Sequence, residues 1–364
     1  MTDKPQFLFT TGQNGGEAVL KRELARKWPE FRFAFSRPGF LTFKLPPDTE
    51  LYDDFDLDSI FARSHGFSLG KVAGDDASLM AENVWKTFGD RPCRRVHVWA
   101  REVAAPSEIQ GGSPLDRIAS RARCAIQTTC PWPERLAEGA YDPTHPADPG
   151  DFVLDCVVVE PDQWWVGYHR AHGVSSQWPG GMFPLEMPCD AVSRAWLKME
   201  EALRWARLPI PAEARFAELG SAPGGSSQAL LGRGWYVIGV DPAEMAPAVA
   251  EHPRFTHIRR RASQVRRREF RRIRWLTADM NVAPSYTLSV VEDIVTHPEV
   301  NVRGMLLTLK LPQWDLADHI PEYLDRVRSW GYNRIQARQL QHNRQEICVA
   351  ALQQPFYRKG LRRR

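Results

Sequence analysis

Lys310 occupies the sequence position that most strongly suggests chemistry. It directly follows the apolar run of residues 305–309, which predicts a buried strand that ends at the lysine. An unpaired ammonium group at the end of a buried strand is costly, so this residue needs either a partner or a task. A lysine amine that has given up its proton can serve as a general base. Lys310 is therefore a candidate catalytic residue.

A turn of small residues predicts a ligand that contains a nucleoside. After an apolar strand predicted over residues 215–219, the chain reads Gly-Ser-Ala-Pro-Gly-Gly over residues 220–225 and opens a helix. Small side chains let a ligand approach the backbone, and free N–H groups at a helix N-terminus bind carboxylates or phosphates. One strand later, Asp241 follows residues 236–240, in a position where a carboxylate can accept hydrogen bonds from ribose hydroxyls. Together these features indicate a nucleoside-containing cofactor.

The turn differs from that of dinucleotide-binding proteins. The G-x-G-x-x-G pattern requires a glycine where Ala222 stands. The pattern Leu-Gly-x-x-Pro-Gly-Gly over residues 219–225 instead resembles the S-adenosylmethionine loop of FtsJ-type ribose methyltransferases. A strand, turn and helix without a ligand is the alternative interpretation of this segment.

The rest of the second half extends the resemblance. FtsJ-type RNA ribose 2′-O-methyltransferases carry a Lys-Asp-Lys-Glu tetrad, and its members match Lys198, Asp279, Lys310 and Glu346. The surrounding segments look most like the bacterial branch that methylates a cytidine ribose in large-subunit ribosomal RNA. The resemblance implies RNA as the partner and S-adenosyl-L-methionine as the cofactor. The residues that it implies as cofactor contacts are Ser193, Gly220, Ala222, Pro223, Gly224, Gly225, Asp241 and Asp279.

The tetrad also suits the chemistry of a ribose hydroxyl. Such a hydroxyl must lose its proton as the methyl group arrives, so a neutral amine is a suitable base and no metal is needed. We expect Lys198 to lower the Lys310 pKa by like-charge repulsion, while Asp279 and Glu346 hold the amines in place. Taken singly, Lys198 is better explained as the flank of an amphipathic helix, and Glu346 as an exposed strand residue.

Alternating strands and helices must position these residues. From residue 189 onward, strands are predicted over residues 215–219, 236–240, 275–279, 304–310, 334–340 and 346–350, and helices over residues 190–206, 226–231, 287–296 and 317–330. This alternation is typical of an α/β fold with a doubly wound, mostly parallel sheet, whose sites lie at the carboxyl ends of the strands.

The first half predicts a separate α+β region. Residues 6–10, 31–36 and 40–45 are expected to be strands and residues 17–28 a helix, with a Gly/Asp-rich linker over residues 70–76 and a connection to the second half over residues 173–188. The resemblance implies a ferredoxin-like domain over residues 1–75, a THUMP-like RNA-binding domain over residues 76–180, and a Rossmann-like S-adenosylmethionine-dependent methyltransferase domain over residues 181–364.

Composition limits the class of protein. A chain of 364 residues with 43% hydrophobic and 25% charged residues fits a globular protein of two or three domains. No apolar stretch approaches about 18 residues, and the first residues lack an export signal, so a cytoplasmic protein without membrane contact is expected. The six cysteines are scattered without a Cys/His cluster, which argues against a disulfide framework or a structural zinc site.

Charge is distributed unevenly along the chain. Residues 1–180 hold 20 Lys and Arg against 25 Asp and Glu, whereas residues 181–364 hold 28 against 19. Residues 254–274 contain ten arginines and one acid, and the tail of residues 358–364 is also basic. This distribution favours an anionic partner such as RNA, and a solvated arginine-rich face is the alternative. Trp164, Trp165 and Trp178 can stack on bases, although packing in the core is the favoured interpretation.

The sequence therefore predicts an RNA ribose 2′-O-methyltransferase with Lys310 as general base. Family members usually carry an acid near the adenine, whereas this chain reads Arg-Arg-Arg-Ala-Ser-Gln over residues 259–264. A catalytically inactive methyltransferase-fold protein that binds RNA is thus the first alternative, and a cofactor titration separates the two. A nicotinamide-dependent oxidoreductase is the second, disfavoured by the absent G-x-G-x-x-G pattern.

Overall fold

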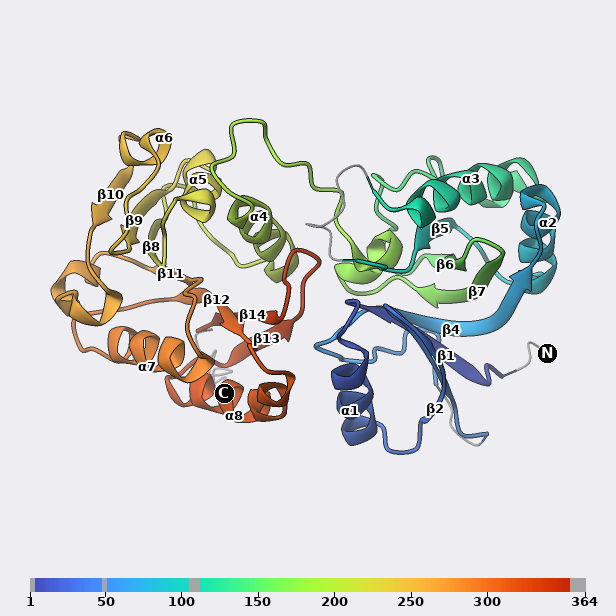
Figure 1. Cartoon of the computed structure of the whole chain (residues 1–364), viewed down its shortest axis with the longest axis horizontal. Coiled ribbons are helices and arrows are strands. Elements are labelled where there is room, and N and C mark those ends of the chain that lie inside the picture. Colours follow the sequence, from blue (N-terminus) through green and yellow to red (C-terminus); the bar gives the residue numbers. More distant parts are fainter. Residues whose placement is uncertain (1–3, 48–50, 105–111, 354–364) are drawn as a thin grey trace, which may run out of the picture. The chain divides into compact units, whose positions relative to one another are not determined.

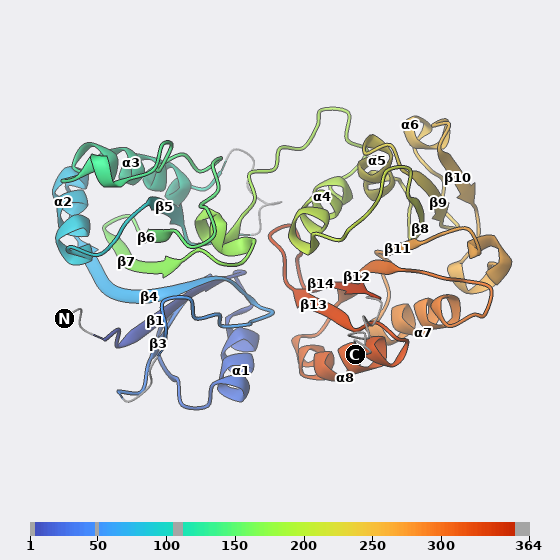
Figure 2. The same ribbon diagram turned by 180° about the vertical axis from the view of Figure 1, so that it is seen from behind.

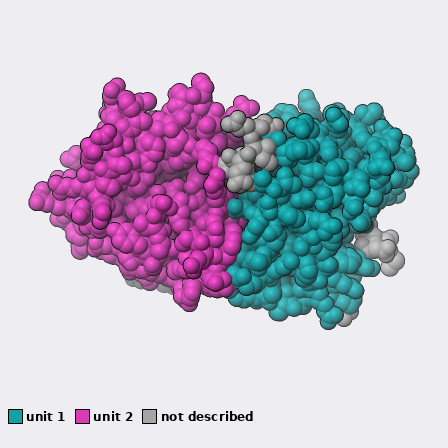
Figure 3. Space-filling model, viewed as in Figure 1, with its two compact units in different colours: residues 1–184 teal, residues 185–364 magenta. Residues whose placement is uncertain are grey.

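The structure, a computed structural model, describes residues 4–47, 51–104 and 112–353 (Figure 1). The chain divides into two compact units, Met1–Pro184 and Leu185–Arg364 (Figure 3). The basic tail of residues 358–364 lies outside the described residues. Within the described part, no helix is both long enough and apolar enough to span a bilayer.

Unit 1 is built on one mixed sheet in the order β2-β3-β1-β4-β7-β6-β5. Its strands are β1 (Phe7–Gly12), β2 (Arg32–Arg37), β3 (Phe40–Lys44), β4 (Ala62–Ala73), β5 (Arg95–Ala100), β6 (Phe152–Glu160) and β7 (Gln163–Arg170). Its α-helices are α1 (Glu17–Lys27), α2 (Ala77–Phe88) and α3 (Pro114–Thr128). Helices α2 and α3 cover one sheet face with buried side chains that include Val84 and Ile126, which pack with Val98 and Cys156.

Strand β4 extends through residues 70–73 of the linker that was predicted over residues 70–76. It pairs with β1 on one side and β7 on the other, so one sheet runs through both predicted N-terminal domains. Gly70 suggested a loop, but it lies at a shift of register within the strand, where its φ of 122° favours glycine. Asp76 then caps α2, because its carboxylate accepts the backbone N–H of Leu79. The division of unit 1 into ferredoxin-like and THUMP-like domains stays a prediction.

Unit 2 has a doubly wound sheet in the order β10-β9-β8-β11-β12-β14-β13. Its strands are β8 (Arg215–Leu219), β9 (Tyr236–Val240), β10 (Phe255–Ile258), β11 (Trp275–Ala278), β12 (Gly304–Lys310), β13 (Arg334–Arg338) and β14 (Glu346–Leu352). The first five strands in the sheet order are parallel, and β14 runs antiparallel between β12 and β13. This order confirms the predicted mixed α/β fold of the second half.

Helices lie on both faces of this second sheet, with α4 and α5 on one side and α7 and α8 on the other (Figures 1 and 2). The helices are α4 (Ala195–Ala206), α5 (Gly225–Gly232), α6 (Pro247–Ala250), α7 (Pro284–Val295) and α8 (Ile320–Ser329). Strands β8, β9 and β12 have the predicted bounds, and α4 begins five residues later than the predicted start at residue 190.

The carboxyl ends of the parallel strands form one edge of the sheet. Gly220 follows β8, Asp241 follows β9, Asp279 follows β11, and β12 ends at Lys310. Because β9, β8, β11 and β12 are neighbours in that order, these residues lie along the edge where doubly wound folds place their sites.

Candidate active site

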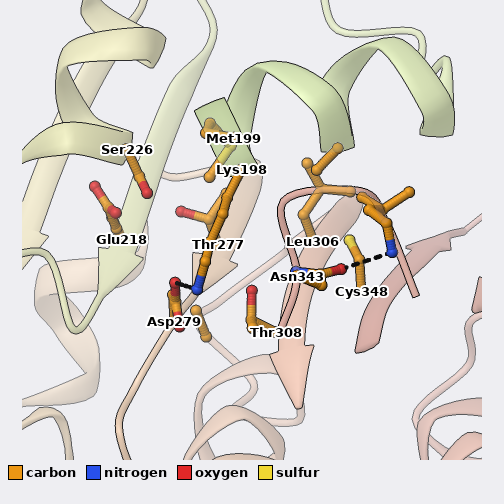
Figure 4. A pocket seen from close by; sticks show the side chains of 13 residues that line it. Lys198, Met199, Glu218, Ser226, Thr277, Asp279, Leu306, Thr308, Asn343 and Cys348 are labelled. Carbon is orange, nitrogen blue, oxygen red and sulfur yellow. Dashed lines mark hydrogen bonds and ion pairs between the residues drawn. The ribbon is translucent and has the colours of Figure 1, made fainter. Parts of the chain in front are cut away.

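The structure brings Lys198, Asp279, Lys310 and Glu346 into contact. Asp279 Oδ1 lies 2.9 Å from Lys310 Nζ. Asp279 Oδ2 lies 3.4 Å from Lys198 Nζ, and Figure 4 shows this second pair. The two oxygens of Glu346 contact the same pair of ammonium groups, Oε1 on Lys198 and Oε2 on Lys310. Two carboxylates thus bridge two ammonium groups, and the formal charges balance.

Strand register explains why residues far apart in the sequence meet here. Lys310 and Glu346 are direct partners in the antiparallel pairing of β12 with β14. The Glu346 side chain is only 4% exposed, so the interpretation of this residue as an exposed strand position is wrong. Lys198 belongs to α4, which lies over the sheet, and its ammonium group reaches the same two carboxylates.

The pKa of Lys310 is raised, contrary to the depression predicted from the sequence. Burial lowers this pKa, but the carboxylates of Asp279 and Glu346 outweigh burial and hold it above the usual value. For the acid Asp279, burial acts in the opposite direction and raises the pKa. The ammonium groups of Lys198 and Lys310 outweigh burial and hold the Asp279 pKa below its usual value. Lys310 is therefore an ammonium group in the unliganded site. The prediction failed because sequence order placed both lysines but gave no distances to the carboxylates.

A cavity of about 20 Å³ opens beside Lys198 and Asp279, with room for about one water molecule (Figure 4). Its lining includes Lys198 and Asp279 of the cluster together with Glu218, Thr308 and Asn343. Glu218 and Asn343 are polar residues to which the sequence analysis assigned no role.

Glu218 is a fully buried acid in strand β8. Its carboxyl group accepts a hydrogen bond from the Ser227 hydroxyl at the start of α5. Burial raises the pKa of Glu218 to about 8, against the opposing effect of hydrogen bonds from Ser227 and Ser226. The group is thus largely protonated at neutral pH. An acid inside the apolar sequence Phe-Ala-Glu-Leu was the available signal for this residue.

Asn343 and Glu201 fix the turn that leads into β14. The Glu201 carboxylate, 1% exposed, accepts the backbone N–H groups of Gln341 at 2.7 Å and His342 at 2.8 Å. Asn343 Nδ2 then donates to Glu346 Oε1 at 3.2 Å. Because Glu201 lies one helical turn after Lys198, helix α4 holds both the lysine and the loop that orients Glu346.

The small-residue turn of residues 220–225 packs tightly against Asp279 and Ser193. Gly220 has a φ of 80°, and a Cβ atom there would lie 2.6 Å from the backbone oxygen of Asp279. A Cβ atom on Gly225 would lie 2.2 Å from Ser193 Oγ, so Ser193 lies against the turn. Gly224, which precedes α5, also has a positive φ, of 120°. The backbone at these positions therefore requires glycine.

Asp241 is tied to the same turn. Its Oδ2 accepts the backbone N–H of Ala222 at 3.2 Å, and its Oδ1 accepts that of Ala243 at 2.8 Å. Each carboxylate oxygen has a further lone pair, so the side chain can still accept hydrogen bonds from a ligand. Ala222 and Pro223 are joined by a cis peptide bond within this turn. The cofactor residues predicted at the ends of β8 and β9 are thus neighbours.

The arginine-rich residues 254–274 form β10 and two short 3-10 turns. Some arginines are used internally: Arg254 lies over the Tyr236 ring at 5.0 Å, and Arg267 pairs with Asp293. Arg259 pairs with Glu244 at 3.1 Å. The exposed arginines of the segment are Arg259, Arg260, Arg261, Arg266, Arg268, Arg271, Arg272 and Arg274.

The three tryptophans considered for base stacking are engaged within unit 1. Trp164 is buried in the core, Trp165 stacks on Phe35 at 5.1 Å, and Trp178 contacts Phe183 at 5.9 Å between ring centroids. Packing is therefore the structural role of these side chains.

Fold and site together define an FtsJ-like methyltransferase, and the model of that family matches residues 191–328. Ribosomal RNA large subunit methyltransferase M from Halorhodospira halophila is 32% identical over 292 residues, which cover 72% of this chain and 83% of that protein. The chain belongs to this methyltransferase M family.

Other similar proteins match over a shorter part of the chain or at a lower sequence identity. Ribosomal RNA large subunit methyltransferase M from Pseudoalteromonas translucida is 30% identical, and the match covers 54% of this chain and 56% of that protein. The crystal structure of TrmN from Thermus thermophilus matches with a TM-score of 0.36 and 12% identity, over 95% of this chain and 99% of that chain. A TM-score this low supports no argument about fold or function.

Proposed function

We propose that the protein catalyses S-adenosylmethionine-dependent 2′-O-methylation of a ribose in RNA, with a cytidine of large-subunit ribosomal RNA as the target. The observation that carries the proposal is the contact of two lysines and two acids beside the small-residue turn at the carboxyl edge of the second sheet. Family membership supports the same activity and the ribosomal RNA substrate.

The residues at the strand ends fit the cofactor. The turn of residues 220–225 carries only small side chains, which let a ligand approach its backbone closely. Ser193, Gly220, Ala222, Pro223, Gly224, Gly225, Asp241 and Asp279 would hold S-adenosyl-L-methionine. When bound, this cofactor supplies a methyl group on a positively charged sulfur.

Lys310 would accept the proton of the ribose hydroxyl as the new bond forms. Its amine must first lose a proton, because the carboxylates of Asp279 and Glu346 keep it as an ammonium group in the unliganded site. Lys198 shares both carboxylates with Lys310, so it holds them in place and leaves Lys310 with only part of their charge. Lys310, Lys198, Asp279 and Glu346 would thus act as one catalytic unit.

We further assign RNA binding to unit 1 and to the exposed arginines of residues 254–274. In this assignment residues 1–75 form a ferredoxin-like domain and residues 76–180 form a THUMP-like domain. The protein would work in the cytoplasm. Its methyl-transfer site would need no metal. The positive charge of the second half supports contact with RNA phosphates.

A single-turnover assay tests the proposed activity. The full chain is mixed with methyl-labelled cofactor and large-subunit ribosomal RNA that lacks native modification, and methylated riboses are mapped by their resistance to alkaline cleavage. We expect transfer to one cytidine and none by Lys310→Ala, with cofactor affinity retained in both proteins. RNA and cofactor binding without transfer by the wild type would instead establish the inactive RNA-binding alternative.

A further inference from the structure

Three titratable side chains of unit 1 gather on one face of its sheet. His97 lies on β5, Asp155 on β6 and His169 on β7, which are adjacent strands. The register pairs His97 with Asp155, and His169 with Val153 two residues before Asp155. One potential ligand atom from each residue lies within 4.8 Å of the others.

Part of this cluster has no hydrogen-bond partner among the described residues. Neither ring nitrogen of His97 is paired, nor is Oδ1 of Asp155. The two residues are 3% and 0% exposed, so bulk water does not satisfy these atoms. Buried polar atoms without partners are uncommon, and an ion or a water molecule is the usual explanation. A water molecule or an ion bound at this cluster would satisfy these atoms.

The His169 ring is held in the orientation of a metal ligand. Its Nε2 lies 2.8 Å from the backbone oxygen of Ser176, which requires an N–H at that nitrogen. Its Nδ1 lies 2.6 Å from Asp155 Oδ2. A lone pair on Nδ1 would face a carboxylate oxygen at this distance, so a proton or a metal ion must lie between or beside them. A histidine whose second nitrogen donates to a backbone carbonyl is the usual arrangement of a metal ligand.

We propose that His97, Asp155 and His169 bind one divalent transition-metal ion, with Zn²⁺ the best match. Two imidazole nitrogens and one carboxylate oxygen are ligands that Zn²⁺ accepts, and water can fill a fourth position. With metal–ligand distances of about 2.0 to 2.2 Å, tetrahedral ligand atoms lie about 3.4 Å apart. The 2.6 Å pair must therefore open by less than 1 Å, and the metal displaces the proton that the pair shares.

The metal would have a structural role. It would join the three strands β5, β6 and β7, and through the Ser176 carbonyl it would fix the segment of residues 175–181 at the end of unit 1. The proposal does not depend on the methyl-transfer activity.

Metal binding by the full chain tests the proposal. The chain is stripped with a chelator, dialysed and titrated with Zn²⁺ and Co²⁺. We expect one equivalent of either ion, the visible absorption bands of low-symmetry Co²⁺, and a rise in Tm of at least about 5 °C at 100 times the Kd. His97→Leu should lose the Co²⁺ bands and the rise in Tm. His145→Ala, which removes an exposed histidine of the same unit, should keep both.

Two outcomes would overturn the proposal. In the first, the wild type binds no stoichiometric metal and its Tm does not respond, a result that needs no variant to fold. In the second, His97→Leu and the wild type bind metal equally. The cluster is then a hydrogen-bonded histidine and aspartate pair, and His97→Leu should leave the Tm unchanged or higher because it removes unpaired buried nitrogens.

Discussion

The charge on Lys310 governs how the proposed reaction depends on pH. Asp279 and Glu346 raise its pKa despite burial, so the ammonium form dominates at neutral pH. Since a base must be deprotonated, single-turnover methyl transfer should rise about tenfold per pH unit below that pKa. Rates measured from pH 6 to 10 at saturating cofactor and RNA test this expectation. A rate that does not change between pH 7 and 9 would contradict it.

Substitutions of Lys310 separate a base from a fixed positive charge. Lys310→Arg keeps the charge but cannot give up a proton, so it should be as inactive as Lys310→Ala. Cofactor affinity of both variants, measured by calorimetry, is the control for an intact site. Wild-type turnover by Lys310→Arg would leave Lys310 with an electrostatic role only.

Glu218 should make the stability of the fold fall as pH rises. Its pKa is raised by burial from an ordinary 4.5 to about 8, so the folded state binds a proton that the unfolded state has lost between these values. Unfolding free energy should therefore decrease across this range, by up to about 4 kcal/mol for a fully buried group. Glu218→Gln mimics the protonated acid and should remove this loss. Urea unfolding of both proteins at pH 5 and pH 8 gives the comparison, and parallel losses would contradict it.

Asp241 should contribute directly to cofactor affinity. Asp241→Ala removes a charged acceptor at the end of β9, and the loss should be about 1.5 to 3 kcal/mol. Asp241→Asn keeps an acceptor for the backbone N–H of Ala222 or Ala243 and separates loss of the charge from loss of the turn. Calorimetric titration with S-adenosylmethionine measures both, and unchanged affinity in a folded Asp241→Ala would remove this residue from the site.

At the scale of elements, helix α4 positions the turn of residues 341–343, which leads into β14, through Glu201. The buried carboxylate holds Gln341 and His342, and the same loop carries Asn343, which donates to Glu346. Glu201→Gln should lower kcat tenfold or more while cofactor Kd stays nearly unchanged, because a small displacement of Glu346 is enough to slow the reaction. Glu200→Gln is the matched control, because Glu200 is adjacent to Glu201 in the sequence but pairs with Arg233 instead of the loop. Equal kcat in both variants would contradict the assignment.

The elements predicted with the correct bounds are those with a mostly apolar sequence. Strands β8, β9 and β12 are short apolar runs that end at a glycine or a charged residue, and their bounds are as predicted. Strand β10 was missed because its four residues lie in an arginine-rich segment. The last four residues of β4 fall in the predicted linker because Gly70 and the following Gly/Asp residues are typical of loops, whereas pairing with β7 keeps residues 70–73 extended.

Contacts between residues that are far apart in the sequence limit how much of the site could be predicted. The resemblance to the FtsJ-type tetrad selected the four cluster residues, and the structure brings them into contact. The direction of the Lys310 pKa shift was not, because it depends on the distances from Lys310 to Asp279 and Glu346. His97, Asp155 and His169 are far apart in sequence and form no motif, and only the register of β5, β6 and β7 brings them together.

For the molecule as a whole, the uneven distribution of charge predicts how RNA binding responds to salt. The second half has an excess of positive charge, and eight arginines of residues 254–274 are exposed. If they contact phosphates, binding releases counterions, and the slope of log K against log salt should fall by about two when three of them are neutralised. The variant is Arg261→Gln, Arg266→Gln and Arg272→Gln.

A second triple variant separates phosphate contact from net charge. Arg204→Gln, Arg303→Gln and Arg328→Gln remove the same charge from exposed positions elsewhere in unit 2. Phosphate contact is local, whereas long-range attraction between exposed charges is screened beyond about 10 Å at 0.1 M salt. The first variant should therefore change the slope and the second should leave it close to that of the wild type, measured by filter binding from 50 to 300 mM salt. Equal slopes in all three proteins would mean that residues 254–274 form a solvated surface without RNA contact.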